Sequence, residues 1–227
     1  MKIILKYLIL FCFSIFAFSV QAADKSEIKK IVIQDQMVKK MWDSLWVYNN
    51  EQRYYETFPL LFRIEKEAEK VGELRVLAHT LENIGTLYFF KGNLEEAKKY
   101  CQKSIDLYEE LGQTENLAGI FACLSNIAQL EGNLKDAMQF SYQAKDLVKY
   151  TKDLNIHYTV FNDLGVLYSI KGQFDSSYHY QKRLLDIVDP MDTISLIQAN
   201  INIAKSFKSM HDFDKAGKYI ELSLIHI

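Results

Sequence analysis

The chain has 227 residues, which is enough for one hydrophobic core or for a short array of repeats. Nine glycines and two prolines are too few for a β-rich protein built on tight turns, and they suit long helices joined by brief connections. The formal net charge is -2 and the basic residues are scattered, so no basic stripe is available for phosphates and we expect no nucleic-acid partner.

The first 22 residues have the pattern of a signal peptide. Lys2 and Lys6 give a positive start, residues 7–18 form an apolar run, and residues 20–22 (Val-Gln-Ala) form a small-residue cleavage site. The apolar run is shorter than the roughly 20 residues that span a bilayer, which favours cleavage over anchoring. We therefore predict export to the periplasm or the extracellular space, with a mature chain that begins near Ala23.

Cys101 and Cys123 remain after the predicted cleavage. Export permits one disulfide between them. The alternative, which we favour, is that both are small apolar side chains buried on packed helices.

Residues 23–73 are predicted to form N-terminal helices that include a degenerate first repeat. Apolar spacing indicates one helix over residues 33–48 and a second over residues 58–71, with Gly72 at the end of the second. Pro59 fits this prediction only if it lies in the first turn of the second helix.

Internal repetition begins after residue 73 and is the strongest pattern in the chain. Seven of the nine glycines lie 40 or 80 residues from another glycine: Gly72 and Gly112; Gly85 and Gly165; Gly92, Gly132 and Gly172. The sequence around the last three also repeats, as Gly-Asn-Leu-Glu-Glu-Ala at 92–97, Gly-Asn-Leu-Lys-Asp-Ala at 132–137 and Gly-Gln-Phe-Asp-Ser-Ser at 172–177. A fourth copy, His-Asp-Phe-Asp-Lys-Ala at 211–216, comes one residue early.

Each copy of this motif is predicted to join two amphipathic helices through a left-handed turn residue. Small residues recur where the two helices of a pair must touch, because a larger side chain there would push the helix axes apart. The predicted contacts are Gly85 with Ala97, Ser125 with Ala137, Gly165 with Ser177, and Ala204 with Ala216.

Residues 83–88 (Asn-Ile-Gly-Thr-Leu-Tyr) with 92–97, and residues 163–168 (Asp-Leu-Gly-Val-Leu-Tyr) with Gly172, resemble the first helix and turn of the tetratricopeptide repeat (TPR) family. The resemblance covers about residues 74–225. It departs from the commonest form in period, about 40 residues instead of about 34, which fits longer helices. We identify residues 74–227 as an array of about four such repeats, the last of them incomplete.

The resemblance implies an all-α fold, a right-handed solenoid of antiparallel helix pairs with a concave face. In the family, first-helix side chains line that face and hold an extended peptide or a partner helix. The corresponding side chains here are Trp42, Trp46, His79, Glu82, Thr86, Phe89, Asn126, Gln129, Asn162, Ser169, Lys205 and Lys208.

Two qualifications follow from the residues at these positions. Trp42 and Trp46 are spaced i, i+4 and have packing of the N-terminal helices as an alternative role. The lysines by which some TPR domains grip chaperone C-terminal carboxylates are replaced by Glu82, Ala122 and Asn162, so that specificity is not expected.

No pattern in the sequence indicates catalysis, a metal or a cofactor. The five histidines are never spaced i, i+4, the acid pairs Glu95-Glu96 and Glu109-Glu110 lie in charged helix faces, and no glycine loop suits a phosphate. We therefore expect a binding protein rather than an enzyme.

The chain ends within the second helix of the last repeat, at an apolar stretch rather than at a polar capping helix. We expect the native protein to continue, and membrane attachment only through such a continuation. Exported arrays of this kind resemble the sensor regions of bacterial histidine kinases and helix–turn–helix regulators. The sequence thus predicts an extracytoplasmic protein- or peptide-binding scaffold, with a structural component of a cell-envelope complex as the alternative.

Overall fold

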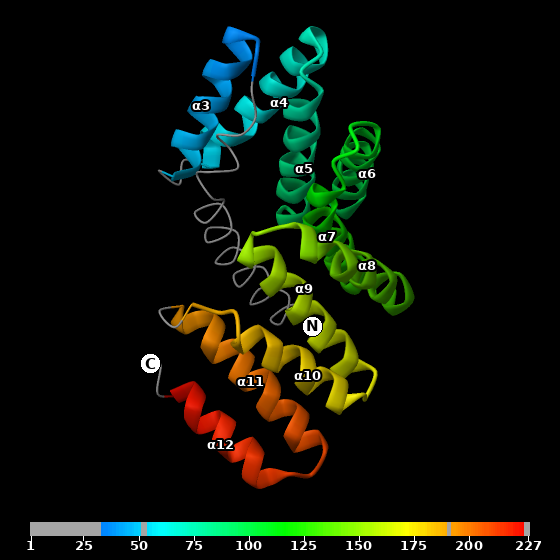
Figure 1. Ribbon diagram of the computed structural model, residues 1–227, viewed down its shortest axis with the longest axis vertical. Coiled ribbons are helices and arrows are strands. Elements are labelled where there is room, and N and C mark those ends of the chain that lie inside the picture. Colours follow the sequence, from blue (N-terminus) through cyan, green and yellow to red (C-terminus); the bar gives the residue numbers. More distant parts are fainter. Residues whose placement is uncertain (1–32, 51–53, 190–191, 225–227) are drawn as a thin grey trace. The chain divides into compact units, whose positions relative to one another are not determined.

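The computed structural model describes residues 33–50, 54–189 and 192–224, and these residues form α-helices, short 3₁₀ turns and connections without any strand (Figure 1). The all-α prediction is confirmed. The chain divides into two compact units, residues 1–123 (unit 1) and 124–227 (unit 2), and each is described separately below. The predicted signal peptide, its cleavage site and the last three residues lie outside the described residues.

Unit 1 contains two consecutive helix pairs and the start of a third. Its helices are α3 (Gln36–Asn50), α4 (Tyr54–Val71), α5 (Leu74–Phe90) and α6 (Leu94–Glu110), followed by a 3₁₀ turn (Thr114–Asn116) and the first half of α7 (Leu117–Leu130). Helices α3 and α4 occupy the region for which the sequence predicts a degenerate helix pair. The division between the units falls inside α7.

Unit 2 contains the second half of α7 and five further helices. These are α8 (Leu134–Leu147), which ends in a 3₁₀ turn (Val148–Tyr150), α9 (Leu154–Ile170), α10 (Phe174–Leu185), α11 (Thr193–Ser209) and α12 (Phe213–Leu224). Helices α9 to α12 each pack against the next and lie side by side in chain order (Figure 1).

The turn inside each repeat has the predicted left-handed residue. Gly92, Gly132 and Gly172 have φ of 76°, 76° and 72°, and His211 adopts φ 61° in the fourth copy. The amide of the following residue donates to a carbonyl five residues back, for example Asn93 N to the Tyr88 oxygen at 3.0 Å. This hydrogen bond is the mark of a Schellman motif, which satisfies carbonyls that the helix end leaves open.

Apolar side chains from successive helices form the core of each unit. In unit 1, Trp42, Leu61, Ile64 and Ile84 belong to one buried cluster. In unit 2, the predicted first-helix residues Leu164 and Leu167 are fully buried, and so is Leu184 from α10. Burying such a side chain contributes roughly 1.5–3 kcal/mol, so these contacts rather than helix propensity hold the pairs together.

The small residues lie at the helix crossings, as predicted. A side chain at Gly85 would begin 3.3 Å from the Ala97 oxygen. The Ser125 hydroxyl donates to the Ala137 oxygen at 3.1 Å, and the Ser177 hydroxyl donates to the Gly165 oxygen at 2.7 Å. These three crossings therefore have the register that the sequence indicated, and the predicted contact of Ala204 with Ala216 stays a prediction.

The start of α4 corrects one prediction. The helix begins at Tyr54 rather than near residue 58, so Pro59 lies inside the helix and beyond its first turn. Proline has no N–H, so the helix lacks one hydrogen bond to the carbonyl one turn earlier. Because Pro59 is exposed, this carbonyl lies on the solvent side of the helix, where water can bond to it.

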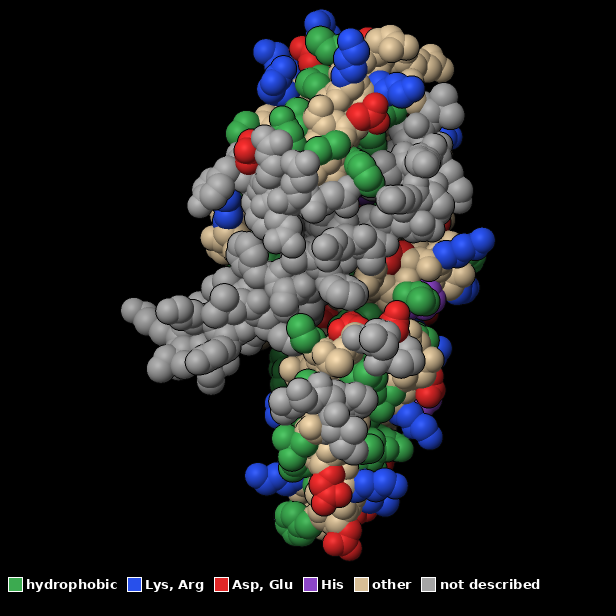
Figure 2. All heavy atoms as spheres, turned by 90° about the vertical axis from the view of Figure 1, so that its left-hand side faces the viewer, with side chains coloured by type: hydrophobic (Ala, Val, Ile, Leu, Met, Phe, Trp, Pro, Cys, Tyr) green, Lys and Arg blue, Asp and Glu red, His purple; other side chains and the backbone are tan. Residues whose placement is uncertain are grey.

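Charged side chains of both signs are interspersed with apolar ones on the face drawn in Figure 2. Cys101 is buried at the α5–α6 crossing, Cys123 is half-buried in α7, and no disulfide joins them. Among the described residues, no helix is both long and apolar enough to cross a membrane.

Candidate functional site

The predicted ligand-contacting side chains are distributed over the first helix of each pair. In unit 1 these helices are α3 and α5, and in unit 2 they are α7, α9 and α11. The "unit 1 face" is formed by Trp46, His79, Glu82, Thr86 and Phe89. The "unit 2 face" is formed by Asn126, Gln129, Asn162, Ser169, Gln198, Asn202, Lys205 and Lys208.

A small polar network marks the unit 1 face. The Nδ1 atom of His79 lies 3.1 Å from Oε2 of Glu82, one turn further along α5. Tyr108, on α6, donates from its hydroxyl to the same carboxylate oxygen at 3.3 Å. In the neutral ring with its proton on Nδ1, the N–H donates a hydrogen bond to the Glu82 carboxylate, and Nε2 of the half-exposed His79 is then an acceptor.

Trp42 is a core residue, which corrects its assignment to the ligand-contacting face. Its side chain is 4% exposed, and its ring centroid lies 5.4 Å from that of His79. The indole Nε1 is buried without a hydrogen-bond partner. Trp42 therefore packs against the His79 ring from the core side, because the apolar face of α3 is turned toward the core.

The other predicted residues of the unit 1 face are half-buried. The Thr86 hydroxyl donates to the backbone carbonyl oxygen of Glu82 at 3.0 Å. Phe89 packs edge-on against Phe90 with centroids 5.3 Å apart. Trp46 is half-buried on α3. The structure thus brings His79 and Glu82 into contact and places Thr86 and Phe89 further along the same helix.

The unit 2 face begins with two amides on α7. The Nε2 group of Gln129 donates to Oδ1 of Asn126 at 3.3 Å and to the Ser125 hydroxyl at 3.4 Å. The Asn126 amide in turn hydrogen-bonds the carboxyl of Asp163 on α9. One amide chain therefore connects the exposed side of α7 to the interior of the α7–α9 contact.

Asp163 is one of the residues near this face that the sequence did not single out as a functional candidate. It is 5% exposed, and its Oδ2 atom is buried without a hydrogen-bond partner. Burial raises the pKa of this carboxyl well above its ordinary value, and the hydrogen bond from Asn126 only partly opposes the effect. Its position in the repeat is held by Asn83 in α5, and that contrast of acid with amide was readable in the sequence.

Amides continue along α9 and α11. The Nδ2 group of Asn202 donates to Oδ1 of Asn162 at 3.4 Å, and Gln198 donates to Oδ1 of Asn202 at 3.0 Å. From the other side, the buried amide of Gln181 donates to the Asn162 carbonyl at 3.4 Å. Gln198 and Asn202 were not predicted, although each lies one helical turn from the next polar residue on α11.

The end of the unit 2 face is cationic. Lys205 and Lys208 are exposed in the last turns of α11, and Ser169 is half-buried near the end of α9. Tyr158, at the opposite end of α9, is half-buried, and desolvation raises its pKa to about 12, partly opposed by a hydrogen bond with Ser195. The face is thus polar along its length and charged at one end.

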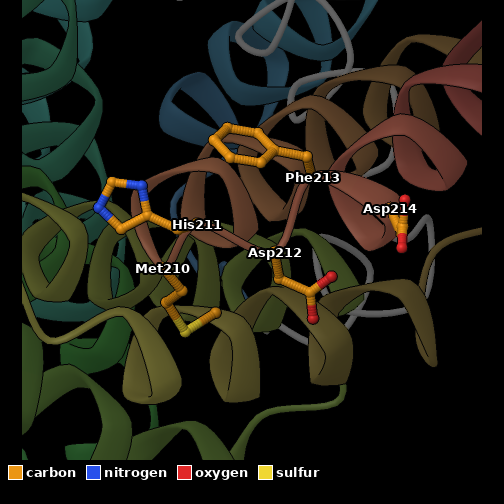
Figure 3. Close-up of a pocket in the computed structure, with 5 residues that line it drawn as sticks. All are labelled: Met210, His211, Asp212, Phe213 and Asp214. Atoms are coloured by element: carbon orange, nitrogen blue, oxygen red, sulfur yellow. The ribbon is translucent and has the colours of Figure 1, made fainter.

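A surface hollow at the last turn does not belong to either face. It is lined by the consecutive residues 210–214, of which His211 and Phe213 point away from Asp212 (Figure 3). The Asp212 carboxylate accepts a hydrogen bond from the backbone amide of Lys215, and its Oδ2 atom forms an ion pair with Nζ of the same lysine at 2.7 Å. The hollow is therefore a consequence of the helix–turn–helix geometry. Among the described residues, no three metal-ligating side chains come together.

Comparison with known proteins agrees with this geometry. A tetratricopeptide repeat profile matches residues 77–111, which cover most of α5 and all of α6. Among solved structures, BtubC (BKLC) from P. vanneervenii has a TM-score of 0.71 at 18% identity, over 95% of this chain and 90% of that chain. MamA has a TM-score of 0.58 at 19% identity, over 78% of this chain and 92% of the MamA chain.

The nearly identical TPR-like repeats of a putative kinesin light chain from Podospora anserina have a TM-score of 0.61 at 12% identity, over 86% of this chain and 97% of that chain. These likenesses show the fold. A sequence likeness of 23% to the threonine–tRNA ligase catalytic subunit of Metallosphaera sedula covers 79% of this chain, which spans only 32% of that protein. The repeat profile and the solved structures agree on a TPR-like helical repeat fold.

Proposed function

We propose that this chain, which contains a tetratricopeptide repeat and has the fold of TPR proteins, is an extracytoplasmic module that binds a protein or peptide on its first-helix faces. The observation that carries the proposal is the chemistry of those faces. Half-buried amides, an imidazole, a carboxylate and aromatic rings project from α5, α7, α9 and α11, whereas the second helices carry ordinary mixed charges.

Half-buried polar groups are suited to binding because their positions are already fixed. The Glu82 carboxylate holds His79, and the Asn202 amide holds Asn162, so little side-chain entropy is lost when a partner arrives. An asparagine or glutamine amide also offers a donor and an acceptor together, which matches a peptide group.

The location and the larger context are part of the same proposal. The basic start, apolar run and cleavage pattern in residues 1–22 support export, and repeat arrays with such a leader suit the input region of a signalling receptor. In that role the chain contributes recognition, and a region beyond these residues contributes the output.

Position-specific photocrosslinking in living cells tests where binding occurs. A benzophenone amino acid is introduced at Gln129 or Ser169 on the unit 2 face, or at Thr86 on the unit 1 face. Matched control sites are Glu109 and Lys182, which are exposed on the second helices α6 and α10. We expect a discrete crosslinked product from the first-helix sites only. Equal crosslinking from the control sites would place the partner elsewhere.

Export has its own test. N-terminal sequencing of the protein purified from the cell envelope should give a chain that begins near Ala23. Recovery of the intact Met1 terminus from the cytoplasm would remove the extracytoplasmic part of the proposal and leave the binding part standing.

A further inference from the structure

The first helices of unit 2 carry very few ionisable side chains. The unit 2 part of α7, residues 124–130, has none; α9 has only Asp163 and His157 besides its tyrosines; and α11 has only Lys205 and Lys208. The second helices α8, α10 and α12 each mix acids and bases. The charge of the unit 2 face is therefore set by two lysines at one end.

No acidic group on these helices opposes the two lysines. Asp163 is the only carboxylic acid on α7, α9 or α11, and it is buried in a place that disfavours its ionised form. The ion pairs recorded within the described residues include neither Lys205 nor Lys208. Both are exposed and separated by three positions, so they lie on the same side of α11.

Half-buried amides lead from α7 to these lysines. Gln129, Asn162 and Gln198 each use one end of the amide in these hydrogen bonds. The other ends are Oε1 of Gln129, Nδ2 of Asn162 and Oε1 of Gln198, and none of them has a hydrogen bond recorded within the described part of the chain. Groups of both kinds are needed to satisfy a peptide main chain, which alternates N–H and C=O.

We propose that the unit 2 face binds an extended polypeptide segment. One or more acidic side chains of the segment contact Lys205 and Lys208, while its main chain contacts the side-chain amides of the face. This inference rests on the proposed function and adds the chemistry of the partner. Opposite charge at one end sets the orientation of the segment, because a basic residue there would meet two ammonium groups.

Polypeptide fits this face better than a polyanion such as nucleic acid or an acidic membrane. Those ligands are recognised by many cations, and their affinity grows with the number of charges neutralised. Two lysines at the end of an uncharged amide surface neutralise few charges of a uniform polyanion. Acceptors such as Oε1 of Gln129 would also face phosphate oxygens, which are acceptors themselves and cannot donate a hydrogen bond.

The test uses the full mature chain and defined probes. A fluorescein-labelled peptide of alternating Thr and Glu is titrated by fluorescence anisotropy beside the same peptide with Gln, or with Lys, in place of Glu. We expect the Glu peptide to bind most tightly, the Gln peptide more weakly and the Lys peptide least. The difference between Glu and Gln should shrink as salt is raised, because exposed charges are screened.

Two charge-matched variants locate the effect. Lys205→Gln with Lys208→Gln should weaken binding of the Glu peptide about five- to tenfold at low salt and leave the Gln peptide almost unchanged. Lys182→Gln with Lys218→Gln removes the same charge from exposed sites on α10 and α12, and should change neither affinity. Circular dichroism confirms that each variant is folded.

The outcomes separate this inference from the function it rests on. If the Glu and Gln peptides bind equally and Asn162→Ala weakens both, the face binds peptide without acidic preference and the inference is wrong. If no peptide responds to changes on this face and the crosslinks above are also absent from it, the proposed function fails as well. The inference of an acidic peptide partner would also be wrong if phosphatidylserine vesicles or a single-stranded oligonucleotide bound through Lys205 and Lys208 and no peptide bound.

Discussion

The helix pairs α5–α6 and α9–α10 share a turn but fill their crossings differently. Gly92 and Gly172 adopt the same left-handed conformation, with the same hydrogen bond from the following amide. A Cβ atom at Gly85 would meet the backbone nitrogen of Cys101 at 3.2 Å, whereas one at Gly165 would overlap Nε2 of the Gln181 side chain. The repeat motif therefore specifies the turn, and local pairs of side chains specify how closely the helices approach.

The same two pairs also differ in their internal polar groups. Asn83 of α5 donates its side-chain amide to the His79 carbonyl at 2.9 Å, within its own helix. The equivalent Asp163 of α9 is buried and has one oxygen without a partner. One copy of the repeat thus contains a buried, incompletely bonded carboxyl group where another copy has a bonded amide. The copies therefore differ in how much this position contributes to the free energy of unfolding.

The largest expected effect comes from adding bulk at the two crossings. Gly85→Leu and Gly165→Leu should each lower the free energy of unfolding by about 3 kcal/mol, measured by urea titration with circular dichroism, because the helices cannot separate without losing core contacts. Gly217→Ala is the control. It lies in α12 with nothing within 4 Å of the added carbon, so it should stabilise by up to about 1 kcal/mol.

A second change distinguishes the two crossings. At Gly165 the obstacle is the Gln181 side chain, so Gly165→Leu should cost much less when Gln181→Ala is already present. At Gly85 part of the obstacle is backbone, so Cys101→Ala should recover much less. Equal recovery at the two sites would show that our account of the difference is wrong, and a neutral Gly165→Leu would show that the glycine is not at a crossing.

Asp163→Asn should remove the polar difference between the pairs, and at pH 8 we expect it to raise the free energy of unfolding by about 1–2 kcal/mol. Burial raises the pKa of Asp163 in the folded protein. Its contribution is therefore fully present below the ordinary carboxyl pKa and is lost as pH rises through the folded value. The parent should lose stability between pH 4 and that value, and the variant should not show this loss. Asn83→Asp makes the reverse change and should destabilise at pH 8.

The sequence was sufficient to predict the repeated elements and their contacts at the crossings. The turn glycines, the Ser125–Ala137 contact and the buried Leu164 and Leu167 all follow from a period that the chain repeats several times. Single-copy features were harder. Pro59 was expected in a first turn because proline is usual there, but a helix can absorb one missing hydrogen bond on its exposed side.

The face residues were only partly predictable. Alignment to a repeat indicates which side of a helix a residue occupies, but not how deeply its neighbours cover it. Trp42 is covered by the core while Trp46, one turn later, is half-exposed. Tyr108 and Gln181 reach the first helices from the second ones, at sequence distances of 26 and 19 residues from Glu82 and Asn162. Such contacts depend on tertiary packing and leave no local pattern.

The left-handed turn residue provides a smaller effect and extends the comparison to α11–α12. His211 adopts φ 61°, a conformation that costs a residue with a Cβ atom roughly 1–2 kcal/mol, whereas the equivalent residues of the other turns are glycines. His211→Gly should therefore stabilise by about 1 kcal/mol after the entropy of the unfolded chain is taken into account. Gly172→His should destabilise by a similar amount. Thermal unfolding followed by circular dichroism measures both, and a loss of stability in His211→Gly would contradict the argument.

The smallest effect concerns the residue that begins the second helix of each pair. The Asn93 side chain accepts the Glu96 amide at 3.3 Å and Asn133 accepts the Asp136 amide at 3.2 Å, but Gln173, at the start of α10, makes no such bond. The extra methylene of glutamine moves its oxygen away from the first-turn amides, which must then be satisfied by water. Gln173→Asn should restore the cap and stabilise by about 0.5–1 kcal/mol.

The reverse change, Asn93→Gln, tests whether the two pairs obey the same rule. It should cost a similar amount, because it removes from α6 the bond that α10 lacks. Both variants keep the amide group and the net charge, so a difference in urea midpoint reports the cap alone. If Asn93→Gln destabilises while Gln173→Asn is neutral, the first turn of α10 gains nothing from a side-chain acceptor. The α9–α10 pair would then differ from α5–α6 at its turn as well as at its crossing.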